Sequence, residues 1–306
     1  MLRQTLYFLA SNNQLRRTAT SNRYARKLAV RFVAGETLEA AVAVVKATNA
    51  AEMTASLDHL GENVTSRGEA TRGADSCIAA LDAIASNGFE ANISCKLTHL
   101  GLDLGADVST PLIDRVVAAA AAHDNFVRID MEGSLYTDTT IEVTEKLFAT
   151  YGHVGTVIQS CLYRSADDVL RLNRQAIRIR LVKGAYLESP KIAYPQKRDV
   201  DSNYRHLSDL LLRWGTYPAF ATHDEKLINW IKSRAEELGK SRDTFEFQML
   251  YGIRRDLQRE LHGDGYRVRL YIPYGTQWYP YLMRRLAERP ANLTFMIGNV
   301  AREAGR

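Results

Sequence analysis

Residues 154–182 read VGTVIQSCLYRSADDVLRLNRQAIRIRLV, and this stretch decides the fold. It begins with a short apolar run at 154–159, passes through a polar turn into a helical pattern at 167–174, and returns to an apolar run at 177–182. A strand, a helix and a second strand in this order predict two parallel strands joined by a crossover helix.

The same unit recurs along the chain. Eight runs have strand character, and they lie at 53–57, 92–97, 126–131, 154–159, 177–182, 219–222, 245–249 and 267–272. Helical patterns separate them, for example at 111–123, 140–151, 167–174, 203–214, 225–239 and 251–262. Eight repeats predict an α/β fold that closes into a (β/α)8 barrel of the TIM type. The sequence contains no GxGxxG or GxxxxGK[ST] motif, which counts against a Rossmann or P-loop fold.

We expect residues 1–306 to form a single barrel domain, because no Pro-, Gly- or Ser-rich linker divides the chain and barrels often reach this length. Residues 1–50 are expected to be an N-terminal helical segment. Its clearest patterns are an apolar stretch at 28–32 and an Ala- and Val-rich stretch at 36–47.

The composition is that of an ordinary globular protein, with 46% hydrophobic and 25% charged residues. The net charge of +5 is not gathered into runs, so we expect no nucleic-acid partner, and the balance fits an anionic small substrate or membrane surface. The sequence has no apolar stretch long enough to span a membrane. Three widely spaced cysteines and scattered histidines predict neither disulfides nor a metal site, and they favour a cytoplasmic location.

Alternation of side chains places charged residues inside the predicted barrel at its carboxyl end, where barrel enzymes have their active sites. If the apolar faces pack on the outer helices, Lys96 and Asp130 both point inward from neighbouring strands. A buried lysine is costly unless it is paired or bound to an anion. Two interpretations stay open: Asp130 orients Lys96 or another cation for function, or the two residues only neutralise each other.

The fifth predicted strand ends in Arg180, Lys183, Gly184 and Ala185. Cations followed by two small residues suit an anionic, planar ligand that approaches the backbone closely. The alternative is a solvated lysine followed by a turn glycine.

The segment after the eighth strand reads YPYLMRRLAER at 279–289. On a helix, Tyr281, Arg284, Arg285 and Glu288 share one face. Two adjacent guanidinium groups are well suited to grip a carboxylate or a phosphate. The alternative is a solvated helix with one salt bridge.

Taken together, these segments resemble proline dehydrogenase, including the dehydrogenase domain of the bifunctional proline-catabolic enzymes. The resemblance covers about residues 51–295, and the length is similar to that of the monofunctional bacterial type. Its most specific motifs are RLVKGAY at 180–186 and YLMRR at 281–285. The other matching runs are LGE at 60–62, SCKL at 94–97, ID at 129–130 and ATH at 221–223.

The resemblance implies a distorted barrel that holds FAD across the carboxyl ends of the strands and oxidises L-proline to 1-pyrroline-5-carboxylate. It implies Asp130 as an active-site acid and Arg180 as the arginine next to flavin N5. The residues implied to bind proline are Lys96, Arg284 and Arg285 at its carboxylate, Glu62 as a gate residue, and Leu181, Tyr186, Tyr271 and Tyr281 around its ring. The residues implied to contact FAD are Met131, Gln159, Arg180, Val182, Lys183, Gly184, Ala185, Thr222, His223 and Glu288.

The resemblance also implies a membrane quinone as electron acceptor, and hence peripheral contact with the inner face of the cell membrane. Two positions depart from the family pattern: Leu187 stands where a tryptophan is common, and Asp224 follows Thr222 and His223. Both lie at the edge of the implied flavin site.

Two other functions compete with this one. A Schiff-base lyase would use Lys96 or Lys183 as its nucleophile. A non-enzymatic binding barrel for an acidic partner would account for the isoelectric point near 9.0. Neither explains the ordered set of family motifs.

Overall fold

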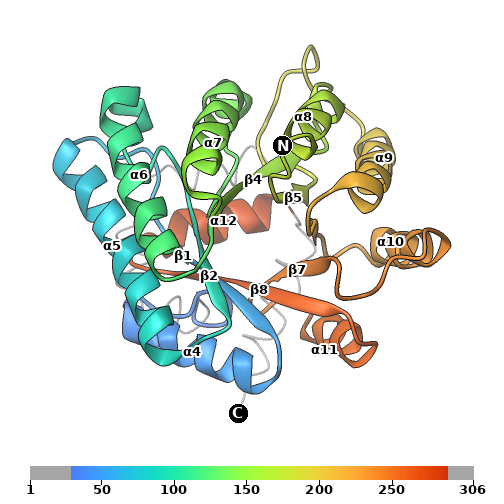
Figure 1. Cartoon of the computed structure of the whole chain (residues 1–306), viewed down its shortest axis with the longest axis horizontal. Coiled ribbons are helices and arrows are strands. Elements are labelled where there is room, and N and C mark those ends of the chain that lie inside the picture. Colours follow the sequence, from blue (N-terminus) through green and yellow to red (C-terminus); the bar gives the residue numbers. More distant parts are fainter. Residues whose placement is uncertain (1–28, 289–306) are drawn as a thin grey trace.

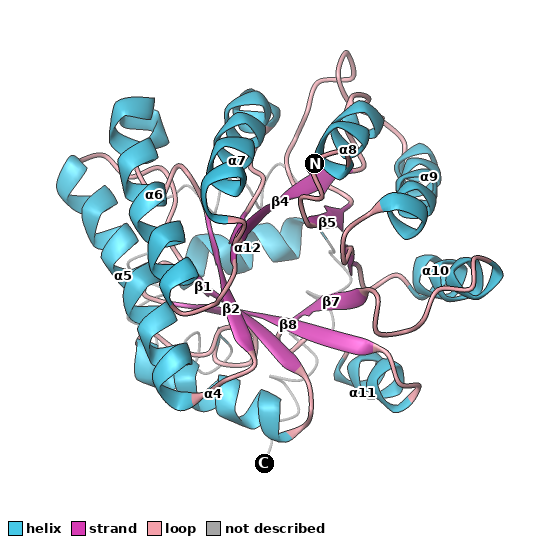
Figure 2. Cartoon of the chain, in the orientation of Figure 1, coloured by secondary structure: helices cyan, strands magenta, loops and turns pink. Residues whose placement is uncertain are grey.

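The computed structural model describes residues 29–288, with side chains described as far as Met283. Its centre is a closed barrel of eight parallel strands in sequence order, with β8 hydrogen-bonded to β1 (Figure 2). Each of the eight predicted runs overlaps a strand, so the predicted barrel is confirmed. The strands are β1 (Thr54–His59), β2 (Ala91–Cys95), β3 (Val127–Ile129), β4 (Val154–Gln159), β5 (Ile179–Val182), β6 (Ala219–Ala221), β7 (Glu246–Leu250) and β8 (Arg267–Tyr274).

A helix follows each of β1 to β7 and lies outside the barrel, as Figure 1 shows. These helices are α5 (Arg67–Asn87), α6 (Ala106–Ala122), α7 (Thr137–Tyr151), α8 (Ser165–Asn173), α9 (Lys197–Trp214), α10 (Glu225–Glu237) and α11 (Arg255–Gly263). Short 3-10 turns, η1 (Leu102–Leu104) and η2 (Ser134–Tyr136), precede α6 and α7. Within residues 29–288, none of the helices has the length and apolar character needed to cross a bilayer.

Local capping chemistry sets where these helices begin and end. At the start of α5, the Ser66 hydroxyl accepts the backbone N–H of Glu69, and the Glu69 carboxylate accepts the backbone N–H of Thr65. This reciprocal pair satisfies one N–H group that the first helical turn leaves open and one N–H group just before the N-cap. Gly88 ends the helix at φ +64°, a left-handed conformation that glycine adopts without steric cost.

The ring of helices is distorted where it would close. The last helix, α12 (Trp278–Glu288), leaves the ring, and in Figure 1 it is drawn across the strands. Helix α4 (Leu38–Ala50) packs on β1 and β8 in its place. The helical pattern predicted at 36–47 corresponds to α4. Within the stretch predicted to be helical at 28–32, the residues after Ala29 form a turn. Residues 1–28 of the predicted N-terminal segment lie outside the described residues.

The strand register determines which side chains face the barrel interior. Residues paired across a parallel ladder face the same side, so one inward residue fixes the inward residues of its neighbours. The pairs Asp58↔Ser94, Ser94↔Arg128 and Gln248↔Arg269 lie on this inward face. Most TIM barrels fill this space with branched apolar side chains. Here the interior is lined mainly by polar and charged groups, which include Ser56, Asp58, Asn92, Ser94, Arg128, Arg180, Glu246, Gln248, Arg269 and Tyr271.

Candidate active site

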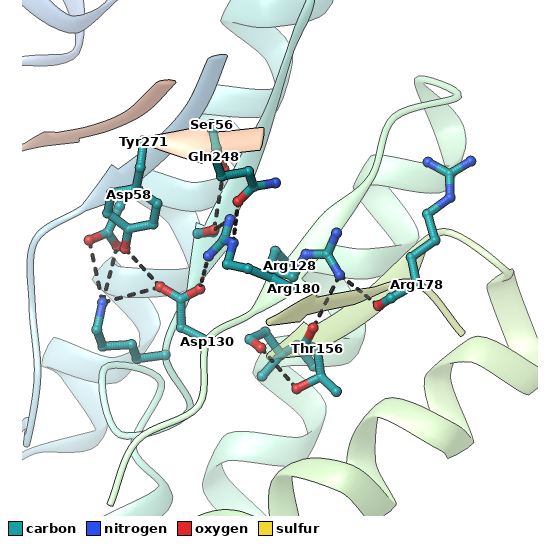
Figure 3. A network of polar contacts seen from close by, with 12 residues as sticks. Ser56, Asp58, Arg128, Asp130, Thr156, Arg178, Arg180, Gln248 and Tyr271 are labelled. Atoms are coloured by element: carbon teal, nitrogen blue, oxygen red, sulfur yellow. Dashed lines mark hydrogen bonds and ion pairs between the residues drawn. The ribbon is translucent and has the colours of Figure 1, made fainter. Parts of the chain in front are cut away.

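Five side chains meet at the carboxyl end of the barrel, and we call them the upper cluster: Asp58, Lys96, Asp130, Arg180 and Tyr271. Figure 3 labels four of them, Asp58, Asp130, Arg180 and Tyr271. The Lys96 Nζ lies 3.3 Å from Asp58 Oδ2 and 3.6 Å from Asp130 Oδ2. Arg180 donates from Nη1 to Asp130 Oδ1 at 2.6 Å, and the Tyr271 hydroxyl donates to Asp130 Oδ2 at 2.7 Å. The predicted inward positions of Lys96 and Asp130 are therefore confirmed.

Asp130 is the centre of the upper cluster. It lies just beyond β3 and joins Lys96 from the end of β2, Arg180 from β5 and Tyr271 from β8. Although burial opposes ionisation, Arg180 and Lys96 hold the pKa of Asp130 below its usual range. Both carboxylate oxygens accept hydrogen bonds, so Asp130 is better suited to fixing its three partners than to taking up a proton. The interpretation that Asp130 orients a cation fits this geometry.

The charge state of Lys96 bears on its chemistry. Burial favours the neutral amine, but Asp58 and Asp130 outweigh it and raise the pKa of Lys96 above its ordinary value. Glu62 and Tyr186 add to the same effect. A protonated lysine attracts a carboxylate and is a poor nucleophile, which argues against the Schiff-base lyase.

Arg180 is held on every side. Its Nη2 donates to Ser94 Oγ at 3.0 Å, its Nε donates to Gln248 Oε1, and its guanidinium lies 5.2 Å from the centre of the Tyr271 ring. A planar cation with four fixed partners has little rotational freedom left. It can therefore present a positive charge to a ligand above it without rearranging.

A second charged layer lies deeper in the barrel. The Arg269 Nε donates to both carboxylate oxygens of Glu246, at 2.9 and 3.1 Å, and the Gln248 amide also donates to Glu246. Arg128 donates to the carbonyl oxygens of Thr156 and Arg178, at 3.1 and 2.6 Å. Because Gln248 contacts both Glu246 and Arg180, one network runs from the floor of the barrel to its mouth.

Lys183, at the carboxyl end of β5, lies between two carboxylates. Its Nζ is 2.6 Å from Asp201 on α9 and 2.8 Å from Asp224 at the start of α10, and Lys197 pairs with the same two aspartates. Burial opposes ionisation of Asp224, but Lys183 lowers its pKa to about 2. The family departure at Asp224 thus adds a negative charge, which Lys183 and Lys197 balance.

The backbone after Lys183 requires glycine. Gly184 has φ +109°, and a Cβ there would lie 2.3 Å from Cys161 Sγ and 3.4 Å from Gln159 Oε1. The sequence suggested that small residues here let a ligand approach. The structure shows that atoms of the segment after β4 occupy the side of Gly184 on which a Cβ would lie, and the half-buried Ala185 follows it.

Other predicted cofactor residues surround the ends of β3 to β6. Gln159 is buried and donates from Nε2 to the Glu132 carbonyl at 3.0 Å, and Val182 pairs with it in register. The His223 Nε2 accepts the backbone N–H of Leu250 at 3.0 Å, which leaves the proton of the neutral ring on Nδ1. The Thr222 hydroxyl accepts the backbone N–H of Asp224 at 3.1 Å, and Met131 is buried.

Helix α12 packs against the segment that follows β1. Trp278, Tyr281 and Leu282 form an apolar cluster with Phe32 and Leu60, and Leu60 lies two residues before Glu62. This contact brings α12 to the carboxyl end of the barrel. Arg284, Arg285 and Glu288 belong to α12, but their side chains lie outside the described residues.

The sequence matches one family over most of its length. The family model described as proline dehydrogenase matches residues 41–297. The chain belongs to the proline dehydrogenase family. It is 41% identical to proline dehydrogenase 1 of Bacillus subtilis strain 168, over 99% of this chain and 100% of that protein. It is also 41% identical to the proline dehydrogenase of Deinococcus radiodurans, over 97% of both chains.

Solved structures of larger relatives share the fold. Proline utilization A from Bdellovibrio bacteriovorus has a TM-score of 0.82 and 27% identity over 90% of this chain, and the enzyme from Bradyrhizobium japonicum has 0.77 and 26% over 90%. The chain spans about a third of those proteins, 34% and 32%. Membership of the proline dehydrogenase family makes the chain an enzyme, and it rules out the non-enzymatic binding barrel.

One predicted residue does not reach the site. Leu181 was predicted to line the proline ring, but it alternates with inward-facing Arg180 and is fully buried on the outer side of β5. Its carbonyl accepts the hydroxyl of Tyr204 from α9, which lies on that side. The register instead places Leu250 next to Tyr271 on the inner face.

Several interior residues were not predicted from the sequence. Asp58 partners Lys96, and Arg128, Glu246, Gln248 and Arg269 make up most of the deeper layer. The sequence does contain a signal for some of them. Ser56 and Asp58, and likewise Glu246 and Gln248, are polar residues separated by one apolar residue, so the two members of each pair face the same side of the strand.

Proposed function

We propose that this chain oxidises L-proline to 1-pyrroline-5-carboxylate with FAD as its cofactor. The observation that carries the proposal is the upper cluster, in which Asp130 fixes Lys96 and Arg180 side by side at the carboxyl end of the barrel. Asp130 thereby holds two cations in place, Lys96 for the substrate carboxylate and Arg180 for the flavin. Membership of the proline dehydrogenase family gives this arrangement its substrate.

The substrate carboxylate would be held by Lys96 together with Arg284 and Arg285 of α12. Lys96 is protonated and faces the barrel mouth, and the first turns of α12 pack near the loop that carries Glu62. Three cations around one carboxylate would fix the proline ring and limit its rotation. Tyr186, Tyr271 and Tyr281 would wall the ring.

The residues present fit FAD at the ends of β4 to β6. Arg180, Lys183 and the Nδ1–H of His223 supply donors from β5 and from the segments that follow β5 and β6, a set suited to an anionic cofactor. Met131, Gln159, Val182, Gly184, Ala185, Thr222 and Glu288 complete the proposed contacts. When bound, FAD would accept the hydride that leaves the substrate.

The protein's own contribution to this chemistry is position and charge. The hydride leaves the ring carbon that lies next to the nitrogen and away from the carboxylate, because the C=N bond of the product forms there. The substrate amine must be neutral for this step. Arg180, rigid in its four contacts, would stabilise negative charge that develops above it. Tyr271 would hold the position of Asp130 and bar a 4-hydroxyl group from the ring.

The electron acceptor that we propose is a membrane quinone, with the chain in the cytoplasm and touching the inner face of the membrane. Apolar side chains at the barrel mouth support this proposal. Leu135 is 84% exposed and Leu187 is 57% exposed. Their segments are joined, because Glu188 accepts both the N–H and the hydroxyl of Ser134.

The visible absorbance spectrum of the purified protein tests the function. We expect a flavin spectrum that bleaches when L-proline is added without oxygen, and whose colour returns with a soluble quinone. A protein that stays colourless and inert after reconstitution with FAD would contradict the proposal. The Bdellovibrio relative is inactivated by N-propargylglycine, so we expect the same compound to abolish proline oxidation here.

A further inference from the structure

A second buried carboxylate, Glu132, lies two residues beyond Asp130. It is 4% exposed, and its carboxylate accepts two hydrogen bonds from Thr98. The Thr98 backbone N–H donates to Oε1 at 3.1 Å, and the Thr98 hydroxyl donates to Oε2 at 2.6 Å. A buried carboxylate with two donors from one residue holds that residue firmly.

Thr98 connects Glu132 to the substrate side of the site. It lies two residues after Lys96, so fixing Thr98 fixes the end of the segment that presents the ammonium group. The Thr98 carbonyl accepts the backbone N–H of Val64 at 3.4 Å, and Val64 lies two residues after Glu62.

Glu132 also reaches the cofactor side. Its backbone carbonyl accepts the Gln159 amide at 3.0 Å, and Gln159 is among the residues proposed to face FAD. One residue therefore holds the segments behind Lys96 and Glu62 through its side chain, and Gln159 through its main chain.

We propose that Glu132 is a positioning residue for proline oxidation, which sets the place and the electrostatic strength of Lys96 by holding Thr98. The inference rests on the proposed function, because it needs Lys96 to bind the substrate carboxylate. Glu132 acts through Lys96 and Thr98, with no contact to the substrate itself.

The charges around Glu132 make this role depend on pH. The titratable groups whose charges act on or with that of Glu132 are Lys96 at the end of β2, Glu62 after β1 and Tyr136 of η2. Burial raises the pKa of Glu132 to about 7, against the opposing effects of the Thr98 bonds and Lys96. Glu132 therefore gains a negative charge as the pH rises through neutrality. That charge offsets part of the attraction between Lys96 and a substrate carboxylate.

The test uses cyclopentanecarboxylate, which has the ring and carboxylate of proline but no amine to titrate. Its inhibition constant against L-proline is measured with the FAD-loaded enzyme between about pH 6 and pH 8, where a carboxylate keeps its charge. We expect the constant to rise on the order of fivefold across this range in the wild type, from the added negative charge. In Glu132→Gln it should change less than about twofold, because the titrating charge is gone.

Glu188→Gln is the matched control. Glu188 accepts the same two kinds of bond, from the N–H and hydroxyl of Ser134, at 2.8 and 2.5 Å. Its loss should leave the wild-type pH dependence in place. If Glu132→Gln keeps that dependence, or if Glu188→Gln flattens it equally, the inference is overturned.

Thr98 supplies an independent pair of variants should Glu132→Gln fail to fold. Thr98→Val removes one bond to Glu132, so the inhibition constant should rise about fivefold at about pH 6, where Glu132 is mostly uncharged with or without that bond, with kcat for proline changed less than about twofold. Thr98→Ser, which keeps the hydroxyl group, should restore the wild-type inhibition constant. If the wild type oxidises proline but the inhibition constant of Thr98→Val is unchanged, the inference is overturned while the proposed function stands. A wild type that neither oxidises proline nor binds the inhibitor would overturn the proposed function as well.

Discussion

Asp130→Asn gives the sharpest test of the upper cluster. The substitution keeps the size of the side chain and removes one negative charge from between Arg180, at 2.6 Å, and Lys96, at 3.6 Å. The Arg180 and Asp130 side chains are only 6% and 11% exposed, so solvent cannot replace the lost charge.

The structure sets the size of the expected effect. Breaking a buried ion pair by removing one partner destabilises a protein by about 3–5 kcal/mol. Here Lys96 keeps Asp58, and Arg180 keeps Ser94 and Gln248, so the loss should lie near the lower end. We expect the free energy of unfolding to fall by about 3 kcal/mol. We also expect proline oxidation to fall sharply, because both cations lose the group that fixes them.

The assay is urea unfolding at one fixed FAD concentration, since bound cofactor adds its own stabilisation. Asp75→Asn is the control, because Asp75 pairs with Arg115 at a similar 2.8 Å but the two side chains are 55% and 49% exposed. Such a surface pair contributes less than about 1 kcal/mol. If Asp130→Asn lost no more stability than Asp75→Asn, the network would not hold these cations as argued.

The pH dependence of stability gives a second test of Asp130→Asn. The pKa of Asp130 is lowered in the folded chain, so its ionised form stabilises the fold above its unfolded pKa, about 3.9. This stability is lost as the pH falls through the lower, folded pKa. As the pH falls, the free energy of unfolding should therefore decrease more steeply for the wild type than for Asp130→Asn. Parallel curves would contradict the assignment of the lowered pKa.

Three further substitutions probe other parts of the site. Tyr271→Phe removes a buried hydrogen bond to a charged acceptor, so unfolding by urea should show a loss of about 2 kcal/mol, and kcat/KM for trans-4-hydroxyproline should rise relative to proline. Gly155→Ala places a Cβ 2.3 Å from the Arg178 carbonyl oxygen and 2.9 Å from Arg128 Nη1, and a thermal melt should show a loss of about 3 kcal/mol. Asp224→Asn keeps the helix cap but removes a charge beside Lys183; flavin fluorescence should show tighter FAD binding by about 1 kcal/mol, and urea unfolding should show a loss of stability, because the ionised Asp224 stabilises the fold.

Much of the site could be predicted because strand alternation is strict. An outer layer of helices demands apolar residues on one face of each strand, so a charged residue in an otherwise apolar run must point inward. That rule alone brings Lys96 and Asp130 together on the inner face. It could have supplied Asp58 too, which shares the inner face of β1 with Ser56.

Leu181 shows where the prediction was wrong. The inward position of Arg180 already required Leu181 to face outward, since neighbouring side chains in a strand alternate. The role that the family resemblance implies for Leu181 is one that its position in the strand forbids. Leu250, which the register brings to Tyr271, could not be chosen from sequence without knowing how β7 and β8 align.

The replacement of α12 by α4 in the outer ring of helices could not be predicted from the sequence, for a different reason. The pattern at 279–289 predicts a helix equally well inside or outside the ring, because amphipathicity does not say which neighbour is buried. The deciding contacts join Trp278 and Leu282 to Phe32 and Leu60, more than 200 residues earlier in the chain. Only the folded structure brings these segments together.

The polar interior is best explained by function, because stability alone would favour another solution. Buried ion pairs are often no more stabilising than well-packed apolar groups of the same volume. An apolar core of the usual barrel type was therefore open to this fold. Yet Glu246, Gln248 and Arg180 form an unbroken chain of contacts up to Asp130 at the mouth. A charge fixed this way needs no reorganisation when a ligand arrives, and that is the property that catalysis by a preorganised site requires.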